Sequence, residues 1–243
     1  MEAIQDYRHS LARSRWALTH ADRPDTFQLC GSTWDLLPGV FAPVYSPTTG
    51  FSLRLLGLDD PRPGSRSGSL LEIGCGTGVI AVAGAVAGHD PVVAVDINEA
   101  AVHNAALNAE RHGVADRFRA VHSDLFDALP PGERFDTIFW HSNYVLAPAD
   151  YRYASMHERG YVDPGYAAHR RFLAQAPQRL APGGTVLLHF SARGELDTLR
   201  RIAAECGRAL RPVRRAVFQE GAHAIEHLLV EVTTAAPPHP TGG

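Results

Sequence analysis

The sequence contains no lysine, because all 23 of its basic residues are arginine. This absence excludes mechanisms that need a lysine side chain, among them Schiff-base aldolases, pyridoxal-phosphate enzymes, Walker-type phosphate-binding loops and a lysine general base. Any chemistry at the site must therefore use histidine, carboxylates, tyrosine, backbone amides or a cofactor.

Cysteine is scarce and net charge is low. The three cysteines, Cys30, Cys75 and Cys206, are too few and too scattered for a disulfide framework or a zinc site, and they favour a reducing cytoplasm. A net charge of -3 provides no field that attracts nucleic acid or an anionic membrane, so we expect neither as a partner. The amino-terminal residues 1–19 are neither a signal peptide nor a membrane span, and the most apolar stretch, 79–88, is roughly half of what a bilayer requires.

A segment rich in proline, glycine and serine, residues 59–69, predicts a linker. The residues before it, 1–58, predict an amino-terminal cap that closes over the substrate. Residues 70–232 predict one catalytic domain, and residues 233–243, which are rich in proline and glycine, predict a disordered tail.

The expected elements of the main domain alternate between strands and helices. The predicted strands are 70–73, 91–95, 118–122, 135–140 and 185–190. The predicted helices are 79–87, 99–112, 165–180 and 195–206. Two further strands, 214–218 and 224–232, are predicted to close the sheet as an antiparallel pair. The cap is expected to hold a helix over 3–19, small strands and turns over 26–45, including 40–42, and a helix over 48–58. Apolar strands separated by helices predict an α/β fold with a doubly wound, mostly parallel sheet and an antiparallel last strand.

Three glycines at alternate positions follow the first predicted strand: Gly74, Gly76 and Gly78. Such a strand, turn and helix lets a ligand approach backbone amides with no Cβ in the way, although a tight turn alone explains the pattern too. The dinucleotide fingerprint requires its third glycine at the position of Val79. A nucleoside other than a nicotinamide cofactor is therefore favoured.

Polar side chains end the next two strands. Asp96 lies about twenty residues past the glycines, where a carboxylate meets two ribose hydroxyls, or where it caps the following helix. Ser123, Asp124, Leu125 and Phe126 end the third strand and suit the edge and face of a purine. Three successive strand ends with complementary groups predict a nucleoside site at this edge of the sheet.

In these motifs the chain resembles the seven-stranded class I S-adenosylmethionine-dependent methyltransferases. The resemblance rests on Glu72-x-Gly74-x-Gly76-x-Gly78, on Asp96, on residues 123–125 and on the turn at 180–185. It implies S-adenosylmethionine as cofactor, with the glycines at its methionine end, Asp96 at the ribose, and Asp124 and Leu125 at the adenine. The implied cofactor-binding residues are Glu72, Gly74, Cys75, Gly76, Thr77, Gly78, Asp96, Ile97, Asp124, Leu125 and His141.

Within this family the chain is similar to the branch of release-factor glutamine methyltransferases, over residues 40–49, 123–129 and 135–140. That branch follows its fourth strand with Asn-Pro-Pro-Tyr, which receives a planar nitrogen. This chain has His141, Ser142, Asn143 and Tyr144 instead, and only the tyrosine stays in register. The departure puts an amide acceptor in doubt.

Three of these residues form the predicted catalytic set. We hypothesise that His141 acts as a base or orients the acceptor, since an imidazole pKa near 6.5 permits proton transfer, that Asn143 fixes the acceptor, and that Tyr144 lines its pocket. Tyr45 and His189 are further candidate acceptor contacts. No third ligand completes a metal site with His141 and His189, so no metal is expected.

The sequence thus predicts methyl transfer to a nitrogen or oxygen atom of a small molecule in natural-product metabolism, for example antibiotic biosynthesis. We expect the pocket to be closed by residues 1–50 and by a specificity loop over 147–164. The alternatives are methylation of a protein glutamine or an RNA base, a non-catalytic module that binds S-adenosylmethionine, and a nicotinamide oxidoreductase. The acceptor and a homodimeric state stay open.

Overall fold

A seven-stranded sheet forms the centre of the protein, whose computed structural model describes residues 6–235. The strand order is β10-β11-β9-β6-β3-β4-β5. The strands are β3 (Leu70–Ile73), β4 (Val92–Asp96), β5 (Phe118–His122), β6 (Phe135–His141), β9 (Leu180–Ser191), β10 (Arg208–Glu220) and β11 (His223–Thr234). The pairs from β5 to β9 are parallel, and β11 is antiparallel to both of its neighbours. The predicted α/β fold with an antiparallel last strand is confirmed.

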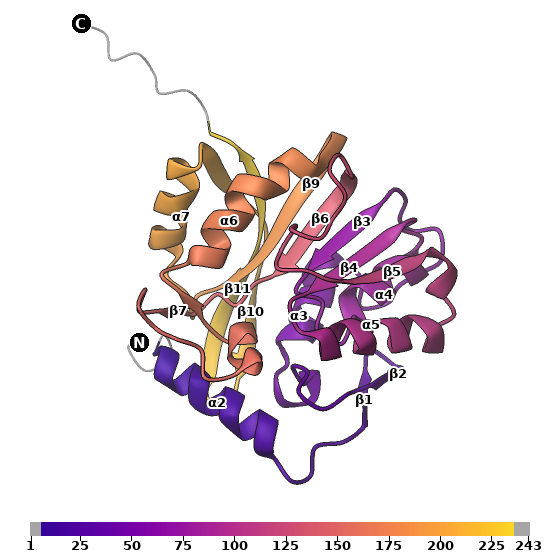
Figure 1. Cartoon of the computed structure of the whole chain (residues 1–243), viewed down its shortest axis with the longest axis horizontal. Helices are drawn as coiled ribbons and strands as arrows, with labels where there is room; N and C mark the ends of the chain where they lie inside the picture. Colours follow the sequence, from indigo (N-terminus) through magenta and orange to yellow (C-terminus); the bar gives the residue numbers. More distant parts are fainter. Residues whose placement is uncertain (1–5, 236–243) are drawn as a thin grey trace, which may run out of the picture.

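Helices cover both faces of the sheet (Figure 1). On one face lie α3 (Thr48–Leu56), α4 (Val79–Ala87) and α5 (Glu99–Arg111), which share one hydrophobic cluster. On the other face lie α6 (Ala167–Gln175) and α7 (Leu196–Glu205), which belong to a second cluster. Neighbouring residues of the buried strands alternate between the two clusters, as Leu70 and Leu71 do, because successive side chains of a strand point to opposite faces.

Prolines explain two differences from the predicted elements. The helix expected over 165–180 ends at Gln175, because Pro177 starts a separate 3-10 turn, η4 (Ala176–Arg179), and β9 already begins at Leu180. Residues 40–42 form no strand, since Pro43 begins the 3-10 turn η1 (Pro43–Tyr45). Proline has no N–H for a strand ladder and fixes its φ near the helical value.

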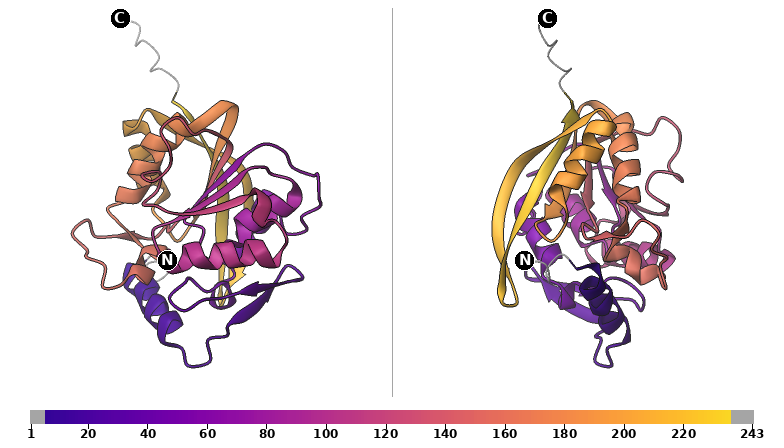
Figure 2. Two further views of the ribbon diagram at one scale, coloured as in Figure 1. Left: turned by 45° about the vertical axis from the view of Figure 1, so that its right-hand side comes forward. Right: turned by 90° about the vertical axis from the view of Figure 1, so that its left-hand side faces the viewer.

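The ends of the chain differ from prediction as well. β11 continues through Thr233 and Thr234, which pair with Ala209 and Arg208 of β10, so these two residues belong to the sheet and not to a disordered tail. Figure 2 shows β10 and β11 as a long hairpin along one side of the molecule. Residues 236–243 of the predicted tail and residues 3–5 of the predicted first helix lie outside the described residues.

The amino-terminal part contains α2 (Tyr7–Thr19) and a hairpin of β1 (Thr26–Leu29) and β2 (Ser32–Asp35). Asp6 caps α2 by accepting from the Arg8 amide. The helix packs against η3 (Met156–Gly160), the 3-10 turn within the long connection that also holds β7 (Leu146–Ala147) and β8 (Asp163–Pro164). Two distant segments are thereby brought together over the end of the sheet.

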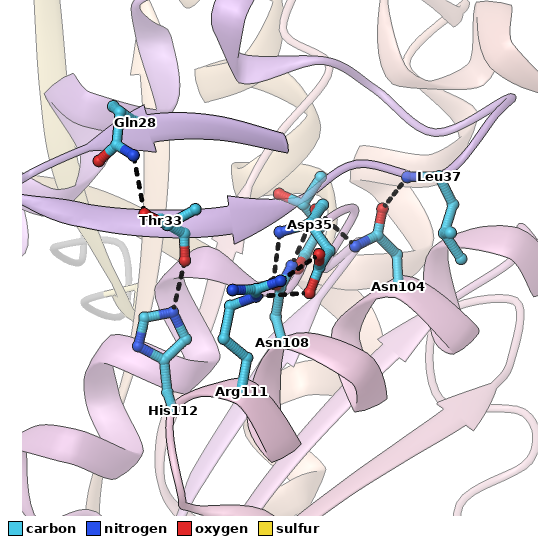
Figure 3. Close-up of polar contacts among 9 residues, drawn as sticks. Gln28, Thr33, Asp35, Leu37, Asn104, Asn108, Arg111 and His112 are labelled. Carbon is cyan, nitrogen blue, oxygen red and sulfur yellow. Dashed lines mark hydrogen bonds and ion pairs between the residues drawn. The ribbon is translucent and has the colours of Figure 1, made fainter. Parts of the chain in front are cut away.

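The hairpin is attached to α5 through two buried asparagines, Asn104 and Asn108 (Figure 3). Asn104 accepts from the Leu37 amide at 2.8 Å and donates to the Asp35 carbonyl at 2.8 Å. Asn108 accepts from the Asp35 amide at 2.8 Å and donates to the carbonyls of Asp35 at 3.1 Å and Thr77 at 2.8 Å. Since Thr77 belongs to the glycine turn, Asn108 links the cap hairpin to that turn.

Replacing Asn108 with leucine is expected to lower the free energy of unfolding by about 2 to 4 kcal/mol. The Asp35 amide and the Thr77 carbonyl would lose their hydrogen bonds to the Asn108 side chain, and each buried unsatisfied group costs about 1–3 kcal/mol. Urea unfolding measures the loss. Arg111→Ala is the matched control, because its ion pair with Asp35 at 2.6 Å is partly exposed and contributes about 1 kcal/mol or less. Equal losses in the two variants would contradict the assignment.

Candidate active site

A large cavity opens where the parallel strands end, and it encloses about 1470 Å³ including the part open to solvent. The glycine turn after β3 and the ends of β4 and β5 line one half, which we call the cofactor half. The loop after β6, α2, the segment 153–161 and Arg193 line the other half, which we call the acceptor half. All predicted cofactor-binding residues except Gly78 line this cavity.

The turn after β3 is held open by glycines and by Asp96. Gly74 and Gly76 have φ of +64° and +53°, in the left-handed region that favours glycine. Asp96 accepts from the Gly76 amide through Oδ2 and from the Asn98 amide through Oδ1, both at 2.9 Å. Burial raises the pKa of the Asp96 carboxyl, and these backbone bonds oppose the shift. The carboxylate is therefore fixed at the end of β4, facing the cavity.

Two predicted cofactor residues have structural partners. A Cβ on Gly78, whose φ is +78°, would lie 2.7 Å from the Cα and Cβ of Ala105, so this glycine lets α4 approach α5. Glu72 is buried, and its Oε2 accepts from the Ala81 amide in the first turn of α4 at 2.8 Å. Burial raises the pKa of the Glu72 carboxyl well above its usual range. Both residues position the turn against the helix that follows it.

The third strand end presents Leu125 to the cavity. Leu125 has φ of +55°, and the Ser123 hydroxyl donates to its carbonyl at 2.9 Å while accepting from the Ala128 amide at 3.0 Å. Asp124 pairs with Arg171 of α6 at 2.9 Å. This side of the cavity offers an apolar surface beside a partly exposed carboxylate.

Asn143 holds its side-chain oxygen free in the acceptor half. Its amide nitrogen donates to the carbonyls of Arg159 at 2.8 Å and Val162 at 2.9 Å. Because both N–H groups are engaged, the orientation of the amide is fixed. Its Oδ1 is buried and has no hydrogen-bond partner among the described residues. Asn143 thus contributes to the cavity lining with a fixed side chain whose buried oxygen has spare hydrogen-bonding capacity.

His141 is a weak base in this setting. Its ring stacks on that of His189, with centroids 4.6 Å apart and an interplanar angle of 19°. Burial, and then the neighbouring His227, lowers the pKa of His141 to about 3. The predicted role as a base near neutral pH, which assumed a pKa near 6.5, therefore needs correction. The neutral ring is suited to orienting a ligand.

Tyr144 completes this loop as a wall of the acceptor half. Burial raises the pKa of Tyr144 to about 12, and the negative charge of Glu220 adds to this shift. The preceding Ser142 donates to the His189 carbonyl at 3.0 Å and so ties the loop to β9.

Neither Tyr45 nor His189 lines the cavity, so their predicted contact with the acceptor is not retained. His189 is fully buried behind His141 and is hydrogen-bonded to Ser52 and His227. The pairing of β6 with β9 sets His189 beside His141, and α3 then covers it through Ser52. Tyr45 packs edge-on against Trp16 of α2, with the ring centroids 4.8 Å apart.

The sequence analysis missed Arg13 and Arg193, which both line the acceptor half. Arg13 lies on α2, for which the sequence analysis predicted a helix but no site residue. Arg193 follows β9, where His189 was the one predicted site residue. The predicted specificity loop does contribute side chains to the cavity. They are Tyr153, Met156, His157, Arg159 and Tyr161.

The protein is expected to lose stability as pH falls from about 6.5 to 5. Burial lowers the pKa of His141 to about 3, of His157 to about 4, and of His189 well below its usual value. The unfolded chain therefore binds protons first, and each histidine lowers the free energy of unfolding by up to about 1.4 kcal/mol per pH unit in that window.

Urea unfolding at pH 7.5, 6.5 and 5.5 measures this slope. His157→Gln is expected to reduce the slope by about 1.4 kcal/mol per pH unit. The control is His103→Gln on the exposed face of α5, which should leave it unchanged. A slope that His157→Gln does not alter would contradict the assignment.

Within residues 6–235, no group of three or more His, Cys, Asp or Glu side chains is placed to hold a metal ion. In the same range no helix is long and apolar enough to cross a membrane.

The chain is similar in sequence and fold to known methyltransferases. The family model "Ribosomal protein L11 methyltransferase" matches residues 43–146. A protein of Methanocaldococcus jannaschii that carries the provisional name protein N5-glutamine methyltransferase is 34% identical over 163 residues, covering 65% of this chain and 78% of that protein. The release factor glutamine methyltransferase of Bordetella pertussis is 35% identical over 124 residues, covering 48% of this chain and 45% of that protein.

The chain spans about half the length of several release factor glutamine methyltransferases that it matches. Among solved structures it is similar to a ribosomal protein L11 methylase of Lactobacillus delbrueckii subsp. bulgaricus, with a TM-score of 0.55, 19% identity, and coverage of 83% of this chain and 84% of that one. This likeness shows the fold. None of these proteins supports a small-molecule acceptor or a role in antibiotic biosynthesis.

Proposed function

The chain belongs to the class I S-adenosylmethionine-dependent methyltransferases, and on this premise we propose that it methylates the side-chain amide nitrogen of a glutamine. The single observation that carries this proposal is the buried, unpartnered Oδ1 of Asn143 in the acceptor half. A hydrogen-bond acceptor held in that way calls for a ligand that donates a hydrogen bond. A primary amide has two hydrogens to donate.

The residues of the cofactor half fit S-adenosylmethionine. Gly74 and Gly76 present backbone with no Cβ, and the Asp96 carboxylate is placed to accept from ribose hydroxyls. Leu125 offers an apolar face for an adenine ring. When bound, S-adenosylmethionine supplies a methyl group that its sulfonium has already activated. The protein then needs to hold the acceptor in line and keep water out.

His141 and Asn143 are suited to holding the amide between them. Asn143 accepts one N–H through Oδ1, and a ring nitrogen of the neutral His141 is available to accept the other. Two such bonds increase electron density on a nitrogen whose lone pair is delocalised into its carbonyl. Alignment of this kind is the main contribution that a protein makes to a displacement on an activated carbon.

The low pKa of His141, about 3, favours an amide over an amine. An amine is protonated at neutral pH, so a strong base must first remove its proton, and His141 is not one. An amide nitrogen carries no such proton, and after methylation it becomes a strong acid that releases its proton to water or to a weak base. The site therefore matches an acceptor that needs no base before transfer.

The named relatives also favour this substrate class. They include a protein N5-glutamine methyltransferase, release factor glutamine methyltransferases and a ribosomal protein uL3 glutamine methyltransferase. The small molecule expected from the sequence rested on the replaced Asn-Pro-Pro-Tyr motif. Because Asn143 presents a free oxygen from two positions further on, that replacement is compatible with an amide acceptor.

Tritium-labelled methyl transfer tests the proposal. The protein is incubated with methyl-labelled S-adenosylmethionine and with a release factor, a ribosomal protein or glutamine peptides, each peptide paired with a glutamate version. Acid hydrolysis of an N-methyl amide releases methylamine, so we expect volatile labelled methylamine from the glutamine substrates only. Labelled methanol would indicate a methyl ester. Label that stays on an amine or on an RNA base after hydrolysis would indicate another acceptor. Binding of S-adenosylhomocysteine without any labelled product would favour a non-catalytic module.

A further inference from the structure

Three arginines line the acceptor half of the cavity, and within residues 6–235 Arg193 is the one of them that forms an ion pair, with Glu220, which lies outside the lining. The three are Arg13, Arg159 and Arg193. The acidic residues that line the cavity are Glu72, Asp96 and Asp124, and all three belong to the cofactor half. In the described part of the chain, no carboxylate therefore faces the acceptor from within the acceptor half.

Arg193 is a buried cation with hydrogen-bonding capacity left over. Its side chain is 8% exposed, and one terminal nitrogen donates to Glu220 Oε2 at 2.9 Å. Glu220 is held from its other oxygen by His227 at 2.8 Å, outside the lining of the cavity. The Nε of Arg193 is buried and has no partner among the described residues. Since a guanidinium carries five N–H donors, the bond to Glu220 leaves donors for a ligand.

Arg13, Tyr144 and Arg193 all line the acceptor half of the cavity. The charges of both arginines act on the Tyr144 hydroxyl, and Arg13 acts on Tyr161 as well. Arg13 has a hydrogen bond to the Ser46 hydroxyl at 3.4 Å and, among the described residues, no ion pair is recorded for it. Two guanidinium groups and a phenol thus belong to the lining of the acceptor half.

We infer that the part of the acceptor half formed by Arg13, Tyr144 and Arg193 is a subsite for a carboxylate that the acceptor carries close to its amide. The inference rests on the proposed function for the position of the amide. Guanidinium groups recognise carboxylates through charge-assisted hydrogen bonds, and a buried one does so strongly. The substrate class is therefore a glutamine with an anionic group beside it.

The sheet order separates this subsite from the cofactor half. The glycine turn follows β3, the loop with Asn143 follows β6, and Arg193 follows β9, in the order β9-β6-β3. Neighbouring strands lie about 4.8 Å apart, so Arg193 lies roughly two strand spacings from the glycine turn, on the far side of the amide site. A carboxylate three carbons from an amide spans about one such spacing. This separation favours the carboxylate of an acceptor over that of the cofactor as the ligand of Arg193.

Matched small probes test the subsite on the full chain saturated with S-adenosylhomocysteine. Glutaramate carries an amide and a carboxylate, glutaramide carries two amides, and pentanoate carries only the carboxylate. Titration by NMR or calorimetry is expected to show glutaramate binding at least about tenfold more tightly than glutaramide. Equal binding of the two probes overturns the inference. If glutaramate binds no better than pentanoate, the amide site fails while the carboxylate subsite stands.

Arginine variants identify the residues that form the subsite. Arg13→Gln and Arg193→Gln are each expected to reduce the preference for glutaramate to about twofold or less, and Arg193→Lys to restore part of it. Arg193→Lys also keeps a cation beside Glu220, so this variant tests the subsite even if Arg193→Gln does not fold. The control is Arg200→Gln on α7, which is half exposed. A loss of S-adenosylhomocysteine affinity in the Arg13 and Arg193 variants, with the probe preference intact, would assign these arginines to the cofactor and overturn the inference.

Discussion

Replacing Asn143 with alanine is expected to lower kcat for amide methylation by about 100-fold or more. The reason is that its Oδ1 supplies a fixed hydrogen-bond acceptor in the acceptor half, and removal of one preorganised hydrogen bond at a reacting group costs about 10²–10³ in rate. The affinity for S-adenosylhomocysteine should stay within about twofold, because the cofactor half does not contain this side chain. Steady-state kinetics at saturating S-adenosylmethionine, with calorimetry for the product, measure both quantities.

Asn143 also ties its loop to the carbonyls of Arg159 and Val162, so a loss of loop order must be separated from a loss of the oxygen. Ser142→Ala is the matched control, since it removes a hydrogen bond at 3.0 Å from the same loop to β9. It should cost about 1 kcal/mol of stability and little of kcat. If Ser142→Ala lowers kcat as much as Asn143→Ala does, the effect comes from loop geometry and the role of Oδ1 is wrong.

Asp96→Ala is expected to lower the affinity for S-adenosylhomocysteine by about 10- to 150-fold. The variant loses a charge-assisted contact of roughly 1.5–3 kcal/mol with the ribose hydroxyls. It also leaves the amides of Gly76 and Asn98 without the carboxylate that now accepts from them at 2.9 Å. Isothermal titration calorimetry at neutral pH measures the change.

Asp96→Asn distinguishes the two contributions. Its side-chain oxygen is able to hold one of the two backbone amides, but the charge is gone. An affinity between that of the parent and that of Asp96→Ala is expected if the charge and the shape of the turn both matter. Unchanged binding in both variants would show that the ribose does not lie at Asp96.

The cofactor half was predictable because each of its parts is local in sequence. An apolar strand, a turn of glycines and a helix are adjacent in the chain, and Asp96 and Ser123 end the next two strands. The carboxyl ends of parallel strands meet at one edge of a sheet, so the strand order brought these residues together. The structure adds that Gly78 and Glu72, through their contacts with Ala105 and Ala81, also hold the turn against α4 and α5.

The acceptor half was predictable only in outline. The sequence indicated the four residues after Trp140 and the long loop that follows, but it gave no sign that Asn143 would be fixed by two carbonyls of that loop. It also pointed to His189, which is on the expected strand edge yet turns into the interior beneath α3. Burial of this kind depends on which helix covers a strand, and residue spacing does not contain that information.

The absence of lysine, the strand pattern and the glycine turn by themselves determined the exclusion of lysine chemistry, the fold class and a nucleoside site, and the resemblance to a family then implied S-adenosylmethionine. These features follow from residue types and from short-range geometry. The tertiary structure alone decided the properties of the acceptor half. Tertiary packing brings Arg13 and Arg193 into the lining of one cavity, buries His141 beside His189 so that its pKa falls to about 3, and leaves the Asn143 oxygen without a partner among residues 6–235. Each of these effects arises from desolvation and contact between distant segments.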